Sequence, residues 1–316
     1  MEKFKKYSID YSVVIPVYNS TDSLFELVNK ICLVFNTSIK ATYEILLIDD
    51  CSTNMDTWKT MKSIADTNEQ VTIIQLTRNF GKTGAVLCGF SNASGNYIFT
   101  MDDDLQHLPE EMPKFIEKQE HDVVMGIFKY KKHPLSKRIT SAMKGWLERI
   151  ILEKPSGIQM GPYRLHKASV VKSMIKIKTP YPFMPALLFN STNDLVTVEL
   201  THGERKFGKS GYSFWKRFKT FSNLLINNSN LLLRLVAITG VLVACLSFIL
   251  GGYYLFKYLI IGVSVPGWTT IVLFTLVLNG LVLFSLGVIG EYLIRIVRGV
   301  ERRPSFLVRQ MYRKEL

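Results

Sequence analysis

The sequence is poor in cysteine and has no cysteine pattern. Its four cysteines, among 316 residues, are scattered without the spacing of a metal site or of a disulfide framework. We therefore expect reduced thiols, and neither a disulfide scaffold nor a cysteine-ligated metal centre. A secretory signal is also lacking, because the basic residues 1–6 are not followed by an apolar segment. We expect the front of the chain to stay in the cytoplasm.

Aromatic and basic residues are not interleaved as they are in RNA-binding modules, although the net charge is +13. The charge is uneven. From Gly203 to the end there are 15 Lys/Arg and 4 Asp/Glu, or +11, which leaves +2 for residues 1–202. The basic part also contains the long apolar runs. A basic excess beside apolar segments favours anionic lipid as a partner and argues against nucleic acid.

Long apolar runs are almost absent before residue 230, which is typical of a soluble domain, but two follow it. These runs, residues 231–259 and 270–294, each exceed the roughly 20 residues that span a bilayer. Basic residues precede the first run and follow the second. They are Lys216, Arg217 and Lys219 before it, and Arg295, Arg298, Arg302 and Arg303 after it. The positive-inside rule predicts a two-helix transmembrane hairpin with both termini in the cytoplasm, and thus a multi-pass protein of the cytoplasmic membrane. The two helices are also candidates for contacts in a homo-oligomer.

The first 200 residues alternate between two patterns. Short apolar, β-branched runs predict strands at residues 11–18, 43–48, 71–76, 97–101, 123–127 and 195–200. Helical spacing of apolar residues, or a helix-start signal, predicts helices near 24–34, 55–66, 83–93 and 109–119. This alternation is typical of an α/β protein with a doubly wound, mostly parallel sheet.

Three consecutive carboxylates, Asp102, Asp103 and Asp104, follow the strand predicted at 97–101. Alternate residues of a strand share a face, so Asp102 and Asp104 are expected to point the same way. Two such hard oxygen ligands suit a divalent cation that keeps waters and takes other ligands from a substrate phosphate. The alternative is an acidic turn that caps a helix beginning near Pro109.

Polar side chains also follow other predicted strands. Asn19 comes after the first strand, and Asp49 and Asp50 end the second. In doubly wound sheets, ligands bind beyond the carboxyl ends of the strands. Together with residues 102–104, these side chains predict one site along a single edge of the sheet.

Basic and apolar residues are mixed in residues 135–152, where Lys137 and Arg138 precede Trp146. This mixture is typical of a helix in a membrane interface; the alternative is a solvated helix packed on the sheet. A basic, glycine-containing loop covers 202–213, and the aromatic-basic pattern returns at 214–228. We therefore divide the chain into a cytoplasmic catalytic domain (1–212), an amphipathic interface helix (213–230), a transmembrane hairpin (231–298) and a basic cytoplasmic tail (299–316).

Five short motifs occur in a fixed order: Val14-Ile15-Pro16-Val17-Tyr18-Asn19, Ile48-Asp49-Asp50-x-Ser52, Arg78-Asn79-Phe80-Gly81, Asp102-Asp103-Asp104-Leu105-Gln106 and His202-x-x-Arg205-x-x-Gly208-x-Ser210. With two C-terminal apolar runs and Gly290-Glu291-Tyr292, the chain resembles polyisoprenyl-phosphate glycosyltransferases. These are GT-A enzymes of glycosyltransferase family 2, related to dolichyl-phosphate mannose synthase. The resemblance covers nearly the whole chain. Residues 205–210 and 301–304 resemble the bacterial undecaprenyl-phosphate type, in particular the 4-deoxy-4-formamido-L-arabinose transferases.

The resemblance implies roles for the matched residues. It assigns the nucleotide sugar to Pro16, Tyr18, Asn19, Ile48, Asp50, Asp103 and Gln106; the metal, Mg²⁺ or Mn²⁺, and the diphosphate to Asp102 and Asp104; and the donor and acceptor phosphates to Arg205, Lys209 and Ser210. Two residues depart from the pattern: Ser20 stands where the family often has Glu, and His107 where it usually has Asp. Residues 161–164 fit the family's Gly-Phe-Arg pattern only loosely.

The chemistry of such a transfer is consistent with these residues. A metal on two carboxylates neutralises the diphosphate that leaves a nucleotide sugar, expected to be UDP-linked. A lipid monophosphate, with a second pKa near 6, is largely ionised already and needs no strong general base. It needs cations to place it, which Lys137 and Arg138 can supply together with Arg205 and Lys209. Direct displacement would invert the anomeric centre, and the product would serve cell-envelope glycan or lipid A modification.

Two other functions stay open at this point. A processive polysaccharide synthase shares the front motifs, but it usually has more membrane helices and a Gln-x-x-Arg-Trp motif, which this sequence lacks. A non-catalytic membrane scaffold would not need Asp102 and Asp104 at one strand end. Metal-dependent binding of a nucleoside diphosphate would separate an enzyme from a scaffold.

Overall fold

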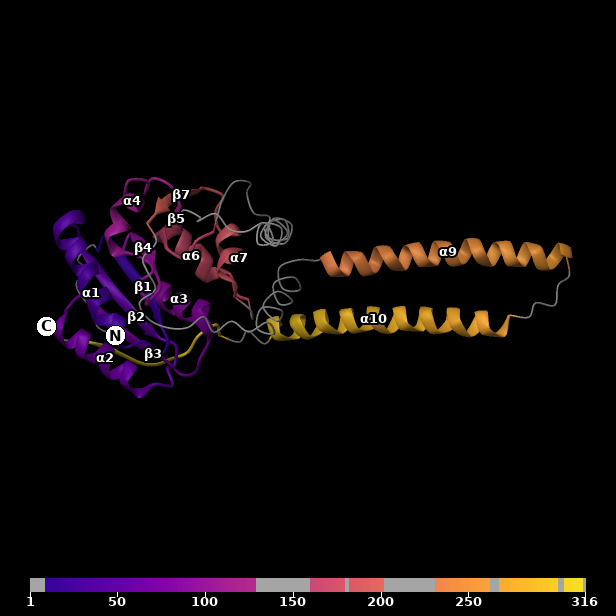
Figure 1. The fold of residues 1–316 in the computed structure, drawn as a ribbon, viewed down its shortest axis with the longest axis horizontal. Coiled ribbons are helices and arrows are strands. Elements are labelled where there is room, and N and C mark those ends of the chain that lie inside the picture. Colours follow the sequence, from indigo (N-terminus) through magenta and orange to yellow (C-terminus); the bar gives the residue numbers. More distant parts are fainter. Residues whose placement is uncertain are drawn as a thin grey trace. The chain divides into compact units, whose positions relative to one another are not determined.

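The computed structural model describes residues 9–128, 160–179, 182–201, 231–261, 267–300 and 304–314. The chain divides into two compact units, which are described separately (Figure 1). The first comprises Met1–Tyr212 together with Arg302–Leu316, and the second comprises Ser213–Glu301. The interface helices predicted at 135–152 and 213–230 lie outside the described residues.

The first unit is built on a mixed sheet with the strand order β7-β5-β6-β4-β1-β2-β3-β8. The strands are β1 (Tyr11–Val17), β2 (Tyr43–Asp49), β3 (Val71–Leu76), β4 (Tyr97–Thr100), β5 (Val123–Phe128), β6 (Arg164–Lys167), β7 (Leu195–Leu200) and β8 (Val308–Arg313). Strands β1 to β4 run parallel, and β5 and β7 run parallel to each other. Strand β6 is antiparallel to both β4 and β5, and β8 is antiparallel to β3. The mostly parallel sheet is confirmed, whereas the two antiparallel strands were not predicted.

Helices cover both faces of this sheet. They are α1 (Asp22–Val34), continued by a π-helical turn (Phe35–Ile39), α2 (Met55–Thr67), α3 (Gly81–Asn92), α4 (Met112–Ile116), preceded by a 3-10 turn (Pro109–Glu111), α6 (Ala168–Lys176) and α7 (Met184–Phe189). The helix predicted at 109–119 is thus shorter. Pro113 has no backbone N–H to bond to the carbonyl of Pro109, which separates the 3-10 turn from α4. After Glu117, residues 118–121 close with turn hydrogen bonds instead of continuing the helix.

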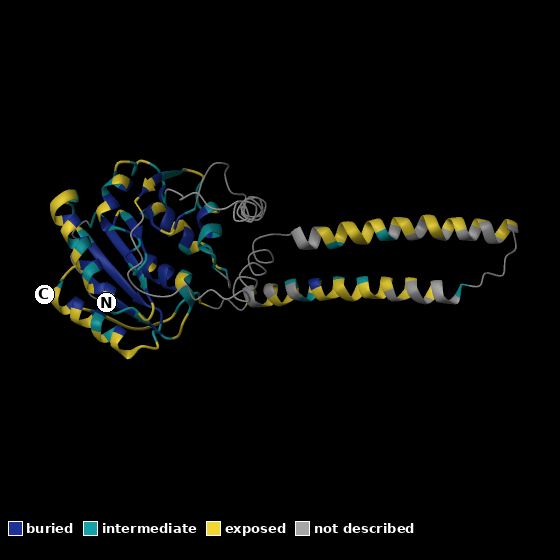
Figure 2. Ribbon diagram, viewed as in Figure 1, coloured by how far each residue is buried: buried dark blue, intermediate teal, exposed yellow. Residues whose placement is uncertain are grey.

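Alternation along the buried strands sorts their side chains into two cores, one on each face. In β1, Val13 and Ile15 join the core that also contains residues of α1 and α2, while Val14 joins the core with residues of α3, α6 and α7. The parallel strands read as continuous apolar runs because both of their faces are covered. Figure 2 shows these strands as the buried centre of the unit.

The last residues of the chain return to this sheet. We expected a basic tail at 299–316, but residues 308–313 form β8 along the edge of β3. The backbone N–H of Thr77 donates to the carbonyl of Leu307 at 2.8 Å, and the Arg309 guanidinium donates to the carbonyl of Thr77 at 3.0 Å. Phe306 packs against the core beneath α3. Residues 306–313 therefore bind the segment that precedes α3 to the edge of the sheet.

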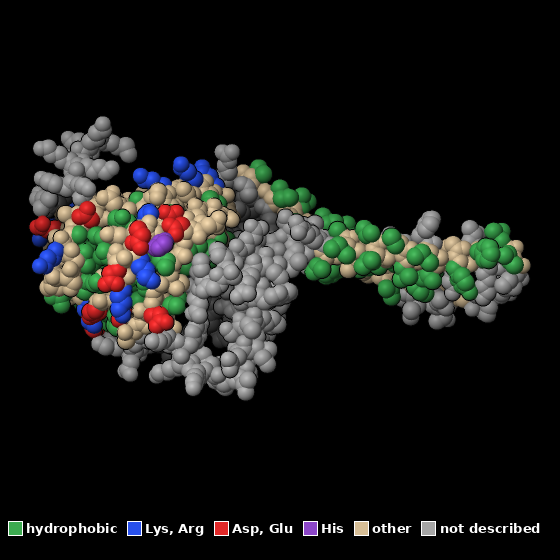
Figure 3. Space-filling view, turned by 90° about the horizontal axis from the view of Figure 1, so that it is seen from above, with side chains coloured by type: hydrophobic (Ala, Val, Ile, Leu, Met, Phe, Trp, Pro, Cys, Tyr) green, Lys and Arg blue, Asp and Glu red, His purple; other side chains and the backbone are tan. Residues whose placement is uncertain are grey.

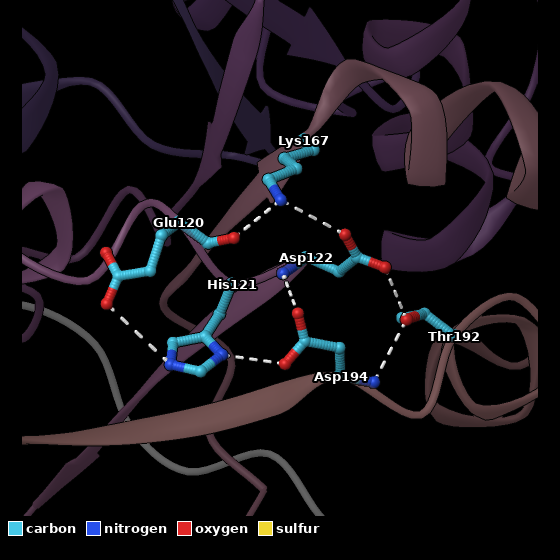
Figure 4. Close-up of polar contacts among 6 residues, drawn as sticks. All are labelled: Glu120, His121, Asp122, Lys167, Thr192 and Asp194. Atoms are coloured by element: carbon cyan, nitrogen blue, oxygen red, sulfur yellow. Dashed lines mark hydrogen bonds and ion pairs between the residues drawn. The ribbon is translucent and has the colours of Figure 1, made fainter.

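A polar cluster joins β5, β6 and β7 at the edge opposite their site-facing ends (Figure 4). The His121 ring lies 2.7 Å from Oδ1 of Asp194, and the backbone N–H of Asp122 donates to Oδ2 of Asp194 at 3.0 Å. Lys167, at the end of β6, donates to the carbonyl of Glu120 at 2.6 Å and pairs with Asp122. These contacts stabilise the pairing of the short β6 with its neighbours.

The second unit contains two long helices in contact, α9 (Leu231–Ile261) and α10 (Trp268–Val300). Their visible surface is mainly apolar, whereas acidic and basic side chains are interspersed on the face of the first unit in Figure 3. Among the described residues, one stretch, Val277–Ile294 of α10, is long and apolar enough to cross a bilayer. The second span of the predicted hairpin is not confirmed and stays a prediction.

Candidate active site

The strand ends that carry the predicted site residues meet at one edge of the sheet. In the parallel register, Val17 lies beside Asp49, and Val14 lies beside Thr100. Strands β1, β2 and β4 are parallel, so Asn19, Asp50 and residues 102–104 all follow strands that run toward the same edge of the sheet. Strand β5 ends at Phe128 and β7 at Leu200, pointing toward this same edge.

The end of β2 is held by its two carboxylates. Asp49 is buried and accepts hydrogen bonds from the backbone N–H of Ser52 at 2.8 Å and from Gln75 Nε2 at 2.9 Å. Oδ1 of Asp50, also buried, accepts the backbone N–H of Phe80 at 2.7 Å. Burial raises the pKa of Asp50, as does the nearby Asp49, while the backbone N–H groups of Phe80 and Gly81 oppose this rise. Asp49 thus holds the loop that follows β2 through its bond to Ser52, and Asp50 connects the end of β2 to the start of α3.

The residues assigned to the nucleotide lie in different surroundings. Tyr18 is 47% exposed directly after β1, and Pro16 is half-buried within it. Asn19 has a left-handed φ of 59°, and its side-chain oxygen accepts the backbone N–H of Asn54 at 3.0 Å, which ties two loops together. Ile48 is fully buried in the core beneath α3, so its side chain has no surface for a ligand. Its side chain packs in the core, and its assignment to the nucleotide stays a prediction.

The three carboxylates after β4 have different partners. Asp102 forms an ion pair with Lys82, in the first turn of α3. Asp103 faces the loop after β1. Burial raises the pKa of Asp103 to about 6; the Ser20 hydroxyl opposes this rise, and the Asp102 charge adds to it. Asp104 Oδ1 accepts the backbone N–H of Gln106 at 3.2 Å. Strand β4 ends at Thr100 and residues 103–105 form a bend, so the shared orientation of Asp102 and Asp104 stays a prediction.

Three further residues contact or face this turn, and the sequence pattern did not assign them. Lys82 pairs with Asp102, and the His107 ring accepts the Asp102 backbone N–H. Arg164 lies opposite Thr100 in the β4–β6 register, with its buried Nε donating to the carbonyl of Gly161 at 2.6 Å. Burial lowers the pKa of Arg164 to about 10, and the Asp102 charge opposes this. The signals in the sequence were the lysine after Asn79-Phe80-Gly81 and the Arg of the loosely matched 161–164 motif.

A metal would find few protein ligands here. Among the described residues, no group of three or more His, Cys, Asp or Glu side chains is arranged to hold one. Asp102 and Asp104 offer carboxylate oxygens, and Gln106 an amide oxygen, which are the ligand types that Mg²⁺ and Mn²⁺ prefer. The set fits a cation that takes its remaining ligands from water and a diphosphate.

The predicted phosphate-binding residues lie outside the described residues. They are Lys137, Arg138, Arg205, Lys209 and Ser210. The first two follow β5 in the chain, and the other three follow β7. Both strands end at the edge where Asp102 lies.

Comparison with known proteins identifies the family. The sequence model of Glycosyl transferase family 2 matches residues 12–175. The chain is 31% identical over 314 residues to the undecaprenyl-phosphate 4-deoxy-4-formamido-L-arabinose transferase of Klebsiella pneumoniae (strain 342), covering 96% of this chain and 94% of that protein. The same-named protein of Salmonella choleraesuis (strain SC-B67) is 31% identical over 313 residues, covering 95% and 93%.

The solved structures that match this chain share less of its sequence. The mannosyltransferase PcManGT from Pyrobaculum calidifontis, in complex with GDP-Man and Mn²⁺, has a TM-score of 0.48 and 16% identity, covering 69% of this chain and 63% of that one. Glucosyl-3-phosphoglycerate synthase from Mycobacterium tuberculosis, with Mn²⁺, UDP and phosphoglyceric acid, has a TM-score of 0.46 and 15% identity, covering 64% and 72%. The family match and the full-length relatives show that this chain is an enzyme of glycosyltransferase family 2, with a GT-A fold.

Proposed function

We propose that this enzyme transfers a sugar from a nucleotide-diphosphate sugar, UDP-linked, to a polyisoprenyl phosphate, undecaprenyl phosphate, at the cytoplasmic face of the membrane. The observation that carries the proposal is the turn at 102–104. Its carboxylates lie at the same sheet edge as Asp50 and the exposed Tyr18, with Lys82 and Arg164 as nearby cations. The names of the full-length relatives support the choice of acceptor. The product would be a lipid-phosphate-linked sugar for cell-envelope glycan or lipid A modification.

The site residues divide the work as follows. When bound, a divalent cation, Mg²⁺ or Mn²⁺, on Asp102 and Asp104 would neutralise the diphosphate leaving group. Tyr18, Asp50 and Asp103 border the place of the nucleoside. Lys82 and Arg164 add positive charge beside the turn, where the diphosphate charge increases as the sugar departs.

The acceptor phosphate is the nucleophile in this proposal. It is already ionised near neutral pH, so the protein has only to place it and to withhold water. We assign its placement to Arg205, Lys209 and Ser210, assisted by Lys137 and Arg138. In-line attack on the anomeric carbon then breaks the bond to the diphosphate and inverts the configuration.

We propose that α9 and α10 anchor the enzyme as a transmembrane hairpin, with both termini in the cytoplasm, and that contacts between such helices join copies of the chain. The orientation is inferred from the Lys and Arg residues that precede α9 and lie at the end of α10 and after it, because such residues favour the cytoplasmic side. A cysteine placed at Ser264 should react with an impermeant thiol reagent added outside intact cells, with the unsubstituted chain as the control. Reaction only when the cells are opened, so that the reagent reaches the cytoplasmic face of the membrane, would refute the topology.

The activity itself is tested with the purified full-length enzyme, a panel of radiolabelled nucleotide sugars and undecaprenyl phosphate. We expect label in the lipid extract with Mg²⁺ or Mn²⁺ and none with EDTA. One sugar per lipid should be found after mild acid release. A polymer would instead identify a processive synthase, and full transfer in EDTA would contradict the metal assignment. Absence of transfer with every donor, despite metal-dependent UDP binding, would reject the lipid acceptor.

A further inference from the structure

His107 is a buried histidine that contacts the acidic turn through its ring. It is 2% exposed, and its Nδ1 accepts the backbone N–H of Asp102 at 2.9 Å. An acceptor role requires that Nδ1 carries no proton, which leaves the other ring nitrogen to carry it. Because Nδ1 is bonded to the backbone, it is not available as a metal ligand.

The orientation of this ring is fixed by aromatic neighbours. It stacks on Phe128 at 5.8 Å between centroids, with 9° between the planes, and on Tyr163 at 5.2 Å and 30°. Tyr163 is fully buried and contacts Phe115 at 4.6 Å. The ring is therefore held by Phe128 at the end of β5 and by Tyr163 before β6, which itself packs on α4. In this orientation Nδ1 points to the backbone N–H of Asp102.

The turn at 102–107 has an irregular backbone that needs hydrogen bonds to hold it. Regular pairing of β4 with β1 ends at Thr100, one residue before Met101, whose N–H still bonds to Val14. Leu105 then adopts a left-handed φ of 61°, which is costly for a residue with a branched side chain. The carboxylates of Asp102 and Asp104 lie between these two points, so the bond to His107 closes the turn that carries them.

We propose that His107 is a positioning residue whose Nδ1 fixes the backbone of the 102–107 turn, so that Asp102 and Asp104 are spaced for one divalent cation. This rests on the proposed function, because the cation is the one that the transfer requires. What the position needs is an acceptor two bonds from Cβ. An aspartate oxygen lies at that same place, which explains in physical terms how His107 can stand where the family usually has Asp.

Three substitutions separate the acceptor from the ring. His107→Asn places Oδ1 where Nδ1 lies, His107→Gln moves the acceptor one bond further, and His107→Phe keeps the aromatic stack without an acceptor. The probe is Mn²⁺ added to the full-length enzyme with UDP, followed by electron paramagnetic resonance of free Mn²⁺. We expect His107→Asn within about threefold of the parent affinity, and His107→Phe weaker by about 10–100-fold, as for other groups that orient metal ligands.

The controls keep this inference apart from the proposed function. Asp104→Asn should abolish Mn²⁺ binding; if it does not, the metal site itself is wrong. If it does, and His107→Phe binds Mn²⁺ like the parent, the positioning role is wrong. Should His107→Phe fail to fold, the pair of amides decides: equal Mn²⁺ affinity of His107→Asn and His107→Gln overturns the proposal, and an advantage of at least tenfold for Asn supports it.

Discussion

The backbone N–H of Phe80 donates a 2.7 Å hydrogen bond to Oδ1 of Asp50, and this bond joins the end of β2 to the start of α3. Two residues later, Lys82 reaches from the same helix to Asp102 at the end of β4. One helix start therefore contacts both carboxylate clusters. Ser305 also lies close to this helix, since a Cβ at Gly84 would lie 2.8 Å from the carbonyl oxygen of Ser305.

The first prediction concerns the two carboxylates that we assign to the cation. Asp102→Asn and Asp104→Asn should each lower transfer more than a hundredfold, because each loses a charged ligand worth several kcal/mol at the leaving diphosphate. Thermal unfolding should change little, since Asp102 is partly exposed. Asp56→Asn, which breaks an exposed ion pair with Lys59, is the matched control. Near-parental activity of both site variants would contradict the assignment.

Much of the sheet could be predicted because its parallel strands are continuous apolar runs. The runs at 71–76 and 195–200 match β3 and β7, and β2 differs by one residue. Strand β6 could not be predicted in this way, because its sequence is Arg-Leu-His-Lys. It is buried only because β4 and β5 pair with it on both sides, and the His166 ring lies 3.1 Å from the carbonyl of Ile98.

The sequence located those candidate site residues that directly follow a strand. It missed those that reach the site only through tertiary contacts. Asn19, Asp50 and Asp102 follow from strand ends alone. Lys82 and Arg164 required knowledge of which distant carboxylate they approach, since neither has a local partner in the sequence. Strand β8 was missed because it pairs with β3 across more than 230 positions of the chain, beyond two apolar helices.

The second prediction concerns the contact between Gly161 and Gly126. A Cβ at Gly161 would lie 1.8 Å from the carbonyl oxygen of Gly126, and backbone atoms of a paired strand cannot move aside cheaply. Gly161→Ala should destabilise the first unit by about 2 kcal/mol or more, lowering Tm by roughly 5 °C. Gly280→Ala, with no atom within 4 Å of the added methyl, is the control. Equal thermal unfolding of the two variants would show that β5 and the segment before β6 are not packed this way.

The third prediction is a pH dependence at the far edge of the sheet. The hydrogen bonds from His121 and from the Asp122 backbone lower the pKa of Asp194 below its ordinary 3.8. Ionised Asp194 is thus favoured in the folded protein, so its contribution is present above about pH 4 and is lost as pH falls through the folded-state pKa. Asp194→Asn should lower Tm by roughly 1–3 °C at pH 7, as for an exposed pair worth at most about 1 kcal/mol.

The measurement for Asp194 is a pair of thermal melts, at pH 7 and at pH 3. The difference between parent and Asp194→Asn should shrink at pH 3, where the parent carboxylate is also becoming protonated. Glu69→Gln, an exposed carboxylate before β3, should show no such change. If the Tm difference between parent and Asp194→Asn were the same at both pH values, the charge of Asp194 would not account for the stability that the contacts in Figure 4 contribute.

The last prediction concerns Arg205, in the basic segment that follows β7. We expect Arg205→Ala to lower transfer by at least a hundredfold, because a bidentate contact to a phosphate at the reacting centre is lost. Arg205→Lys should restore little of it, since a point charge does not reproduce the guanidinium fork. The alternative is an arginine bound to lipid headgroups, and Lys206→Ala distinguishes the two. If Arg205 only binds lipid, both alanine variants weaken membrane association alike, and Arg205→Lys is fully active. If Arg205 binds the reacting phosphate, Lys206→Ala stays active and membrane insertion and Tm of Arg205→Ala are unchanged.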